Sequence, residues 1–126
     1  MVLLTENKID VSGYIDQVFH DESGAVVQFV GTVRKEGNGK ELKGLFYEAY
    51  TEMAEKRLKE ILDEAGSRWG LRKKLLVHRL GEVPVGEASI VIAVSAPHRK
   101  EAFEACSWII DSVKKDVPVW KKDVWQ

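Results

Sequence analysis

The most informative segment of the sequence is Ala25-Val-Val-Gln-Phe-Val-Gly-Thr-Val-Arg34. Its β-branched and aromatic residues favour an extended strand. The run is too continuously apolar for a strand that exposes one face to water, so it predicts a central strand of a sheet. It ends at Arg34, where the polar loop of residues 35–40 begins. The sequence on either side of this run supplies the other strands and the helices.

Segments around this run alternate between strand and helix patterns. Asn38-Gly39 separates it from a second extended stretch, and Asn-Gly is a strong hairpin signal, here with a loop that can exceed two residues. The connection Gly81 to Gly86 is rich in turn residues and favours an antiparallel pair. The predicted strands are 2–8, 25–34, 42–50, 75–80 and 88–95, and the predicted helices are 11–20, 51–69 and 98–115. This order predicts an α+β sandwich in which helices pack on a largely antiparallel sheet.

Length and composition predict one domain over residues 1–126. The chain of 126 residues has 44% hydrophobic and 31% charged residues, and it contains no repeat or linker. Its 19 Lys+Arg against 20 Asp+Glu give a net charge of −1, which excludes the strongly basic surface of a general nucleic-acid binder. No apolar run approaches the roughly 18 residues of a membrane span. With a single cysteine and no targeting signal, we expect a cytoplasmic protein that binds neither nucleic acid nor membrane.

Several common catalytic chemistries find no support in the sequence. Nothing resembles the local context of an activated serine or cysteine nucleophile, and Cys106 lies beside Phe103 and Ile109 on the predicted inner face of the last helix. Cys106 is therefore predicted to be a packed core thiol. The three histidines are scattered without ligand spacing, so no metal site is predicted. Gly31-Thr-Val-Arg34 lacks the spacing of a phosphate-binding loop.

Cations at the ends of predicted elements are the remaining candidates. Arg34 closes the apolar strand, and His98 and Arg99 stand at the start of the last helix. A helix N-terminus attracts anions, whereas cations favour the opposite end. His98 and Arg99 therefore suggest a phosphate or carboxylate bound between them and the backbone. Simple exposure to water explains all three side chains equally well, so both interpretations remain open.

The tail from Lys114 to Trp125 combines four lysines with two tryptophans and the helix-breaking Pro118. Val117-Pro-Val-Trp120 is apolar enough to dock on the rest of the domain, which would hold Lys121 in a defined place. Lys114 and Lys121 flank the proline and can face one pocket. A lysine whose pKa falls through burial or a second cation can act as a base or nucleophile. The residues alone thus predict an anion-binding domain with a candidate catalytic lysine.

Six motifs in this order resemble the large, catalytic subunit of molybdopterin synthase over almost the whole chain. They are Phe29-Val-Gly-Thr-Val-Arg34, Tyr47-Glu-Ala-Tyr50 with Met53 and Glu55, Val77-His-Arg-Leu-Gly81, Val85-Gly-Glu87, Ser95-Ala-Pro-His-Arg99 with Ala102-Phe-Glu-Ala105, and Pro118-Val-Trp-Lys-Lys-Asp123. Each motif alone is weak, but six in register make a specific match. The resemblance implies an α/β hammerhead fold, which is compatible with the predicted α+β sandwich.

The resemblance also implies an activity and partners. The family converts cyclic pyranopterin monophosphate, called precursor Z, into the dithiolene of molybdopterin. Its sulfur arrives as a thiocarboxylate on the C-terminal glycine of a small ubiquitin-like subunit, whose tail enters a pocket of the large subunit. Two large subunits form a central homodimer with a small subunit at each end, which gives a heterotetramer. No resident cofactor or metal is expected.

Carried over position by position, the resemblance predicts the site residues. Lys114 and Lys121 match the catalytic lysines, with Lys114 nearest the glycine of the small subunit, and His98 and Arg99 are expected to come from the other copy in the dimer. Arginine suits a phosphate because its guanidinium donates two parallel hydrogen bonds. The two lysines are expected to polarise oxygen leaving groups and to stabilise the tetrahedral species that forms when sulfur attacks. The predicted substrate-binding residues are Thr32, Val33, Arg34, His98, Arg99, Lys114, Lys121, Lys122 and Asp123.

Two other functions remain as alternatives. A non-catalytic module that binds a ubiquitin-like tail or a phosphorylated ligand would use the same cations, but it would have no turnover for Lys121→Ala to abolish. RNA binding would use Trp108, Trp120 and Trp125 as stacking surfaces beside lysines. The near-neutral net charge argues against RNA, and absence of binding at low ionic strength would exclude it.

Overall fold

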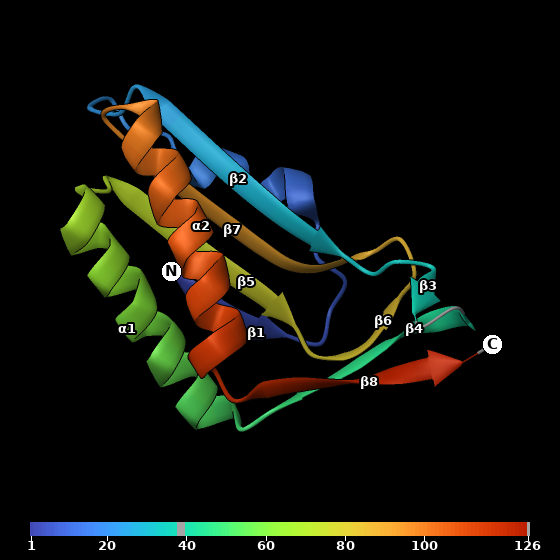
Figure 1. The fold of residues 1–126 in the computed structure, drawn as a ribbon. Coiled ribbons are helices and arrows are strands. Elements are labelled where there is room, and N and C mark those ends of the chain that lie inside the picture. The colour runs from blue at the N-terminus through green and yellow to red at the C-terminus, as the bar shows by residue number, and fades with distance from the viewer. Residues whose placement is uncertain (38–39, 126) are drawn as a thin grey trace.

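Two sheets and two long helices make up the protein, a computed structural model that describes residues 1–37 and 40–125 (Figure 1). The elements are β1 (Val2–Thr5), the 3-10 turns η1 (Val11–Gly13) and η2 (Ile15–Val18), β2 (Ala25–Thr32), β3 (Glu36–Gly37), β4 (Lys40–Ala49), α1 (Thr51–Trp69), β5 (Lys73–Arg79), β6 (Gly81–Pro84), β7 (Ala88–Ala96), α2 (Arg99–Asp116) and β8 (Val119–Trp125). The predicted α+β class is confirmed.

The first sheet has the strand order β1-β5-β7-β2, with β1 parallel to β5 and the other pairs antiparallel. The prediction that residues 25–34 form a central strand is wrong, because β2 lies at the edge of this sheet and β7 lies inside it. The apolar run of β2 has another cause. Val27 and Phe29 pack toward the helices, whereas Val26 and Val30 pack on the opposite face. An edge strand covered on both faces has the same composition as a central one.

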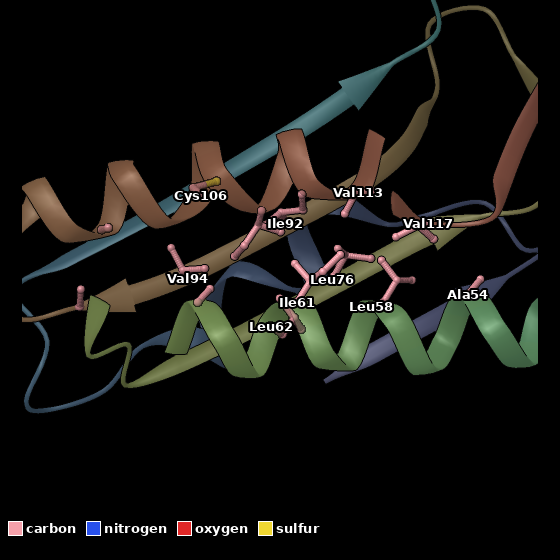
Figure 2. Packing of buried hydrophobic residues seen from close by; sticks show 14 residues of the cluster. Ala54, Leu58, Ile61, Leu62, Leu76, Ile92, Val94, Cys106, Val113 and Val117 are labelled. Carbon is pink, nitrogen blue, oxygen red and sulfur yellow. The ribbon is translucent and has the colours of Figure 1, made fainter. Parts of the chain in front are cut away.

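Both helices cover one face of the first sheet, and the main core lies between them and the strands (Figures 1 and 2). The predicted helix 51–69 is confirmed as α1. Its buried side chains recur at helical spacing and form one apolar stripe: Ala54, Leu58, Ile61, Leu62 and Ala65. Gly70 ends the helix in the left-handed conformation with φ of 62°. Glycine adopts this conformation without the steric cost that a Cβ brings. The prediction for Phe103 on α2 is wrong, since this side chain is 62% exposed. Figure 2 shows Leu58, Ile61, Leu62, Leu76, Ile92 and Val113 gathered in this core.

The predicted helix 11–20 is also wrong, because the structure has two short 3-10 turns there. Gly13 lowers the helix propensity of the segment, and hydrogen bonds such as Tyr14 N–H to the Val11 carbonyl join residues three apart. The segment still contributes to the core, because Val18 is buried against β5 and β7. These turns cover the face of the first sheet that the helices leave open.

The second sheet is built on β4, which pairs with β3, β6 and β8. The hairpin predicted at Asn38-Gly39 is supported by its flanks, since Gly37 pairs with Lys40, while the turn itself lies outside the described residues. The sequence did not predict β6, which occupies the turn-rich connection before β7, or β8. The docking predicted for 117–120 is confirmed, because Val117 is buried and β8 pairs with β4 along its length.

Candidate active site

A cavity of about 730 Å³ lies where the two sheets and the end of α2 meet. Its lining comes from β2, β4, β5, β7, α2 and β8, elements that are far apart in the sequence. Apolar side chains such as Phe29, Ile90 and Val113 form much of the wall. Three cations, Arg34, Lys114 and Lys121, also line it. The cavity therefore combines an apolar surface with a local concentration of positive charge.

Arg34 reaches the cavity from the segment that follows β2, where the pairing with β7 shifts register between Gly31 and Thr32. Thr32 also lines the cavity. Val33, between them, has its side chain in a separate small core. The Val33 N–H donates to the Glu87 carbonyl, and its own carbonyl accepts from the Gly86 N–H. Val33 thus anchors the segment that presents Thr32 and Arg34.

Lys114 and Lys121 come from the last turn of α2 and from β8, on either side of Pro118. On β8, Lys121 lies directly opposite Tyr47 of β4, and both residues line the cavity. Neither lysine forms an ion pair with any residue in ranges 1–37 and 40–125. Like charges left without counter-ions favour the binding of an anion. The predicted juxtaposition of the two lysines is thus present in a single chain.

The remaining predicted site residues lie away from this cavity. His98 and Arg99 are at the opposite end of α2, about 22 Å from Lys114 along the axis at 1.5 Å per residue. Lys122 forms an ion pair of 2.9 Å with Glu48. Asp123 pairs with Leu45 in the β4–β8 register and is not part of the cavity lining. One copy of the chain therefore assembles Thr32, Arg34, Lys114 and Lys121, and a contribution from His98 or Arg99 requires another copy.

His78 also lines the cavity, although it was not predicted as a site residue: the sequence shows it only as a histidine without metal-ligand spacing and as part of the motif Val77-His-Arg-Leu-Gly81. His78 lies on β5 and is only 6% exposed. Its Nδ1 atom is 2.9 Å from the Arg79 carbonyl oxygen, and its ring meets the ring of Tyr47 edge-on with centroids 5.1 Å apart. Burial lowers the pKa of His78 from its ordinary value, and the bond to the Arg79 carbonyl opposes that shift. The sequence feature that could have identified His78 is its position as a polar residue inside the apolar run 75–80.

Cys106 has a structural role in the core. The prediction for Cys106 is confirmed, since the thiol is buried in the main core and burial raises its pKa to about 11.

Among the described residues, no group of three or more His, Cys, Asp and Glu side chains is placed to hold a metal ion. In the same part of the chain, no helix has the length and apolar character needed to cross a membrane.

The fold and the cavity define a small α+β protein with a cationic, partly apolar binding site between two sheets. The chain belongs to the MoaE protein family, whose family model matches residues 4–116. It is 43% identical over 123 residues to the molybdopterin synthase catalytic subunit of Thermoplasma volcanium, a match that covers 98% of this chain and 90% of the relative. This membership confirms the resemblance seen in the six sequence motifs.

Solved structures agree with this assignment. A crystal structure of molybdopterin synthase from Staphylococcus aureus matches with a TM-score of 0.92 and 38% identity, covering 98% of this chain and 90% of that chain. A structure described as the protein–protein complex of subunits 1 and 2 of molybdopterin-converting factor from Helicobacter pylori 26695 matches with a TM-score of 0.81 and 25% identity, covering 98% and 88%. Lys121 lies beyond the residues that the family model matches, on β8.

Proposed function

We propose that this chain is the catalytic subunit of a molybdopterin synthase. It transfers sulfur from the C-terminal thiocarboxylate of a small ubiquitin-like subunit to cyclic pyranopterin monophosphate, which becomes the dithiolene of molybdopterin. Family membership and the names of the relatives support this assignment. The reaction takes place in the cytoplasm and needs no resident cofactor.

The observation that carries the proposal is the convergence of Arg34, Lys114 and Lys121 on one cavity. The thiocarboxylate and the phosphate are both anions, and the cavity offers donors to both without a carboxylate among its described lining residues. Arg34 binds the phosphate through paired hydrogen bonds. Lys114 and Lys121 polarise the oxygen leaving groups and stabilise the tetrahedral species formed by sulfur attack. Thr32 adds a hydroxyl at the edge of the phosphate site.

The proposed partners are a small sulfur-carrier subunit and a second copy of this chain. The H. pylori relative is described as a complex of two different subunits, which supports a small partner that delivers the sulfur. His98 and Arg99 lie too far from the cavity of their own chain to touch a substrate there. We therefore place them at the site of a second copy, in a homodimer with one small subunit at each end. In this arrangement, each active site contains residues from two large subunits.

The direct test mixes the purified chain with thiocarboxylated small subunit and cyclic pyranopterin monophosphate and follows the dithiolene product by mass spectrometry. We expect Lys114→Ala and Lys121→Ala to lower the rate by about 10²-fold or more, the usual cost of removing a group that stabilises developing charge. Lys115→Ala is the matched control, because Lys115 is the exposed neighbour of Lys114 and does not line the cavity.

Two results would contradict the proposal. Product formation that is unchanged in both cavity variants would remove the lysines from the chemistry. A stable complex with the small subunit that never yields product from the native chain would favour the alternative of a non-catalytic binding module.

A further inference from the structure

We propose that His78 is a substrate-binding residue whose Nε2 atom accepts a hydrogen bond from an N–H group of the bound pterin. This inference rests on the proposed function, because it concerns the same cavity and the same substrate. It adds a residue that lies outside the cationic set and that supplies the opposite kind of hydrogen-bonding group.

The tautomer of His78 follows from its contact with the backbone. A carbonyl oxygen can only accept a hydrogen bond, so the bond of 2.9 Å between Nδ1 and the Arg79 carbonyl places a hydrogen on Nδ1. In the neutral ring, Nε2 then carries a lone pair and can only accept. No other described residue is a hydrogen-bond partner of Nε2. Since the side chain lines the cavity, this lone pair is left for a ligand.

The protonation state is fixed by the surroundings of the ring. His78 lies on a strand whose neighbouring residue, Val77, is fully buried, and the ring of Tyr47 packs against it edge-on. Burial lowers the pKa of His78, so the imidazole is neutral near pH 7. The backbone bond and the Tyr47 ring also fix the ring orientation. The acceptor is therefore already oriented before a ligand arrives.

Apart from His78, no polar side chain of the described lining carries an atom that can only accept a hydrogen bond. Arginine, lysine and tryptophan side chains only donate, and no Asp or Glu is among the described residues that line the cavity. Thr32, Tyr47 and Ser89 also line the cavity, but their hydroxyls can donate as well as accept, and the Ser89 hydroxyl donates to the Gly31 carbonyl at 3.2 Å. A reduced pterin carries several N–H groups, and a donor buried against an apolar wall without an acceptor is costly. The cations match the anionic parts of the substrate, and His78 matches its ring.

Two substitutions separate this role from a structural one. His78→Asn keeps an amide N–H near the position of Nδ1, which can still donate to the Arg79 carbonyl, but it places no atom at the position of Nε2. His78→Gln places its amide oxygen near the position of Nε2 and gives up the bond to the Arg79 carbonyl. His78→Asn therefore removes only the acceptor at the Nε2 position, and His78→Gln removes only the bond to the Arg79 carbonyl.

The variants are compared in the complex reconstituted with thiocarboxylated small subunit. We expect His78→Asn to raise KM for the pterin substrate about tenfold, the value of one hydrogen bond, while kcat changes less. We expect His78→Gln to stay closer to the native KM. The reverse order, with His78→Asn native-like and His78→Gln impaired, would show that only the bond to Arg79 matters and would overturn the proposal.

A measurement on the native chain makes the test independent of folding in the variants. In protein with ¹⁵N-labelled histidine, the Nε2 resonance of His78 is expected to shift when substrate is added, while Nδ1 stays protonated. An unchanged Nε2 resonance in protein saturated with substrate would overturn the inference and leave the proposed function intact. A native chain that neither binds nor converts the substrate would overturn both.

Discussion

The two ends of α2 carry similar charge but have different surroundings. His98 and Arg99 begin the helix, and Lys114 and Lys115 lie in its last turn. The helix dipole favours cations at the C-terminal end and disfavours them at the N-terminal end. At the C-terminal end, the chain turns at Pro118 into β8, and residues of β8 and β4 line the same cavity as Lys114. At the N-terminal end, His98 and Arg99 are exposed and do not belong to the described lining of the cavity.

This difference shows why charge alone does not identify a site. A cation becomes part of a pocket where another element forms the facing wall, as the second sheet does for Lys114. At the other end of α2, His98 and Arg99 are exposed, and in the proposed homodimer the facing wall is supplied by the second copy. The same helix thus provides Lys114 to the cavity of its own chain and, in the proposed homodimer, His98 and Arg99 to the site of its partner.

Among the changes that test this comparison of the two ends of α2, Ile109→Ala is expected to have the largest effect. Ile109 is fully buried in the main core, near the middle of α2, and holds both ends of the helix in place. Removing its side chain to Cβ should lower the free energy of unfolding by about 2–5 kcal/mol, measured by urea denaturation. Ile109→Val is the control, with an expected cost of about 0.5–1.5 kcal/mol. An equal loss in the free energy of unfolding for the two variants would mean that the packing of Ile109 does not hold α2 in place.

The next prediction tests whether one active site combines Lys114 of one copy with Arg99 of the other. Arg99→Ala and Lys114→Ala should each lower the rate of product formation by about 10²-fold when tested alone. A mixture refolded together should recover about a quarter of native activity, because half of the random dimers are mixed and each of these has one intact site. The rate is followed by mass spectrometry of the product. A mixture no more active than its components would place both cations in the site of a single chain.

A smaller effect is expected from pH, through the buried ring that lines the cavity near the C-terminal end of α2. The folded-state pKa of His78 is lowered, so the unfolded chain binds a proton at a higher pH than the folded chain does. The contribution of His78 to stability is therefore complete above the unfolded pKa of about 6.5 and declines as the pH falls from there toward the folded pKa.

Urea denaturation between about pH 7.5 and pH 5 measures this slope. His78→Asn and His78→Gln should both flatten it, whatever their effect on activity. A slope that persists unchanged in both variants would assign the pH dependence to other groups.

The smallest effect is expected from the exposed charges themselves. At low ionic strength and without ligand, Arg99→Ala should raise the free energy of unfolding, and Lys115→Ala should lower it, each by about 0.3–1 kcal/mol. Thermal unfolding measures both, and added salt should reduce both differences. Changes of the same sign in the two variants would rule out the dipole as their cause.

Most of the fold was predictable because its main elements have clear periodicity. The stripe from Ala54 to Ala65 specified α1, and the apolar runs specified β5 and β7. β8 was harder to predict. It belongs to a small, partly exposed sheet, and its lysines and tryptophans do not follow the apolar–polar alternation of a strand that borders a core. Phe103 was predicted to face the core but is exposed. Helical spacing shows on which side of the helix a residue lies, but it does not show whether another element covers that residue.

The candidate site was predictable in its charges and not in its geometry. Arg34, Lys114 and Lys121 were identified by their places at element ends and by the family motifs, and the structure brings them to one cavity. The distance between Arg99 and that cavity depends on the length and direction of α2 in three dimensions. His78 was overlooked because its role depends on a backbone carbonyl and a cross-sheet tyrosine, neither of which a spacing rule can detect.

The pairing of β8 with β4 has a consequence for the order in which a newly made chain acquires its parts. Every other element that lines the cavity precedes β8 in the chain, and Val119 is the last of the described residues that belong to the main core. During synthesis from the N-terminus, the sheet and both helices can therefore assemble before Lys121 has been added. A product interrupted after α2 would retain most of the core but lack one wall of the cavity, and in the proposed homodimer it would be a partner with a defective active site.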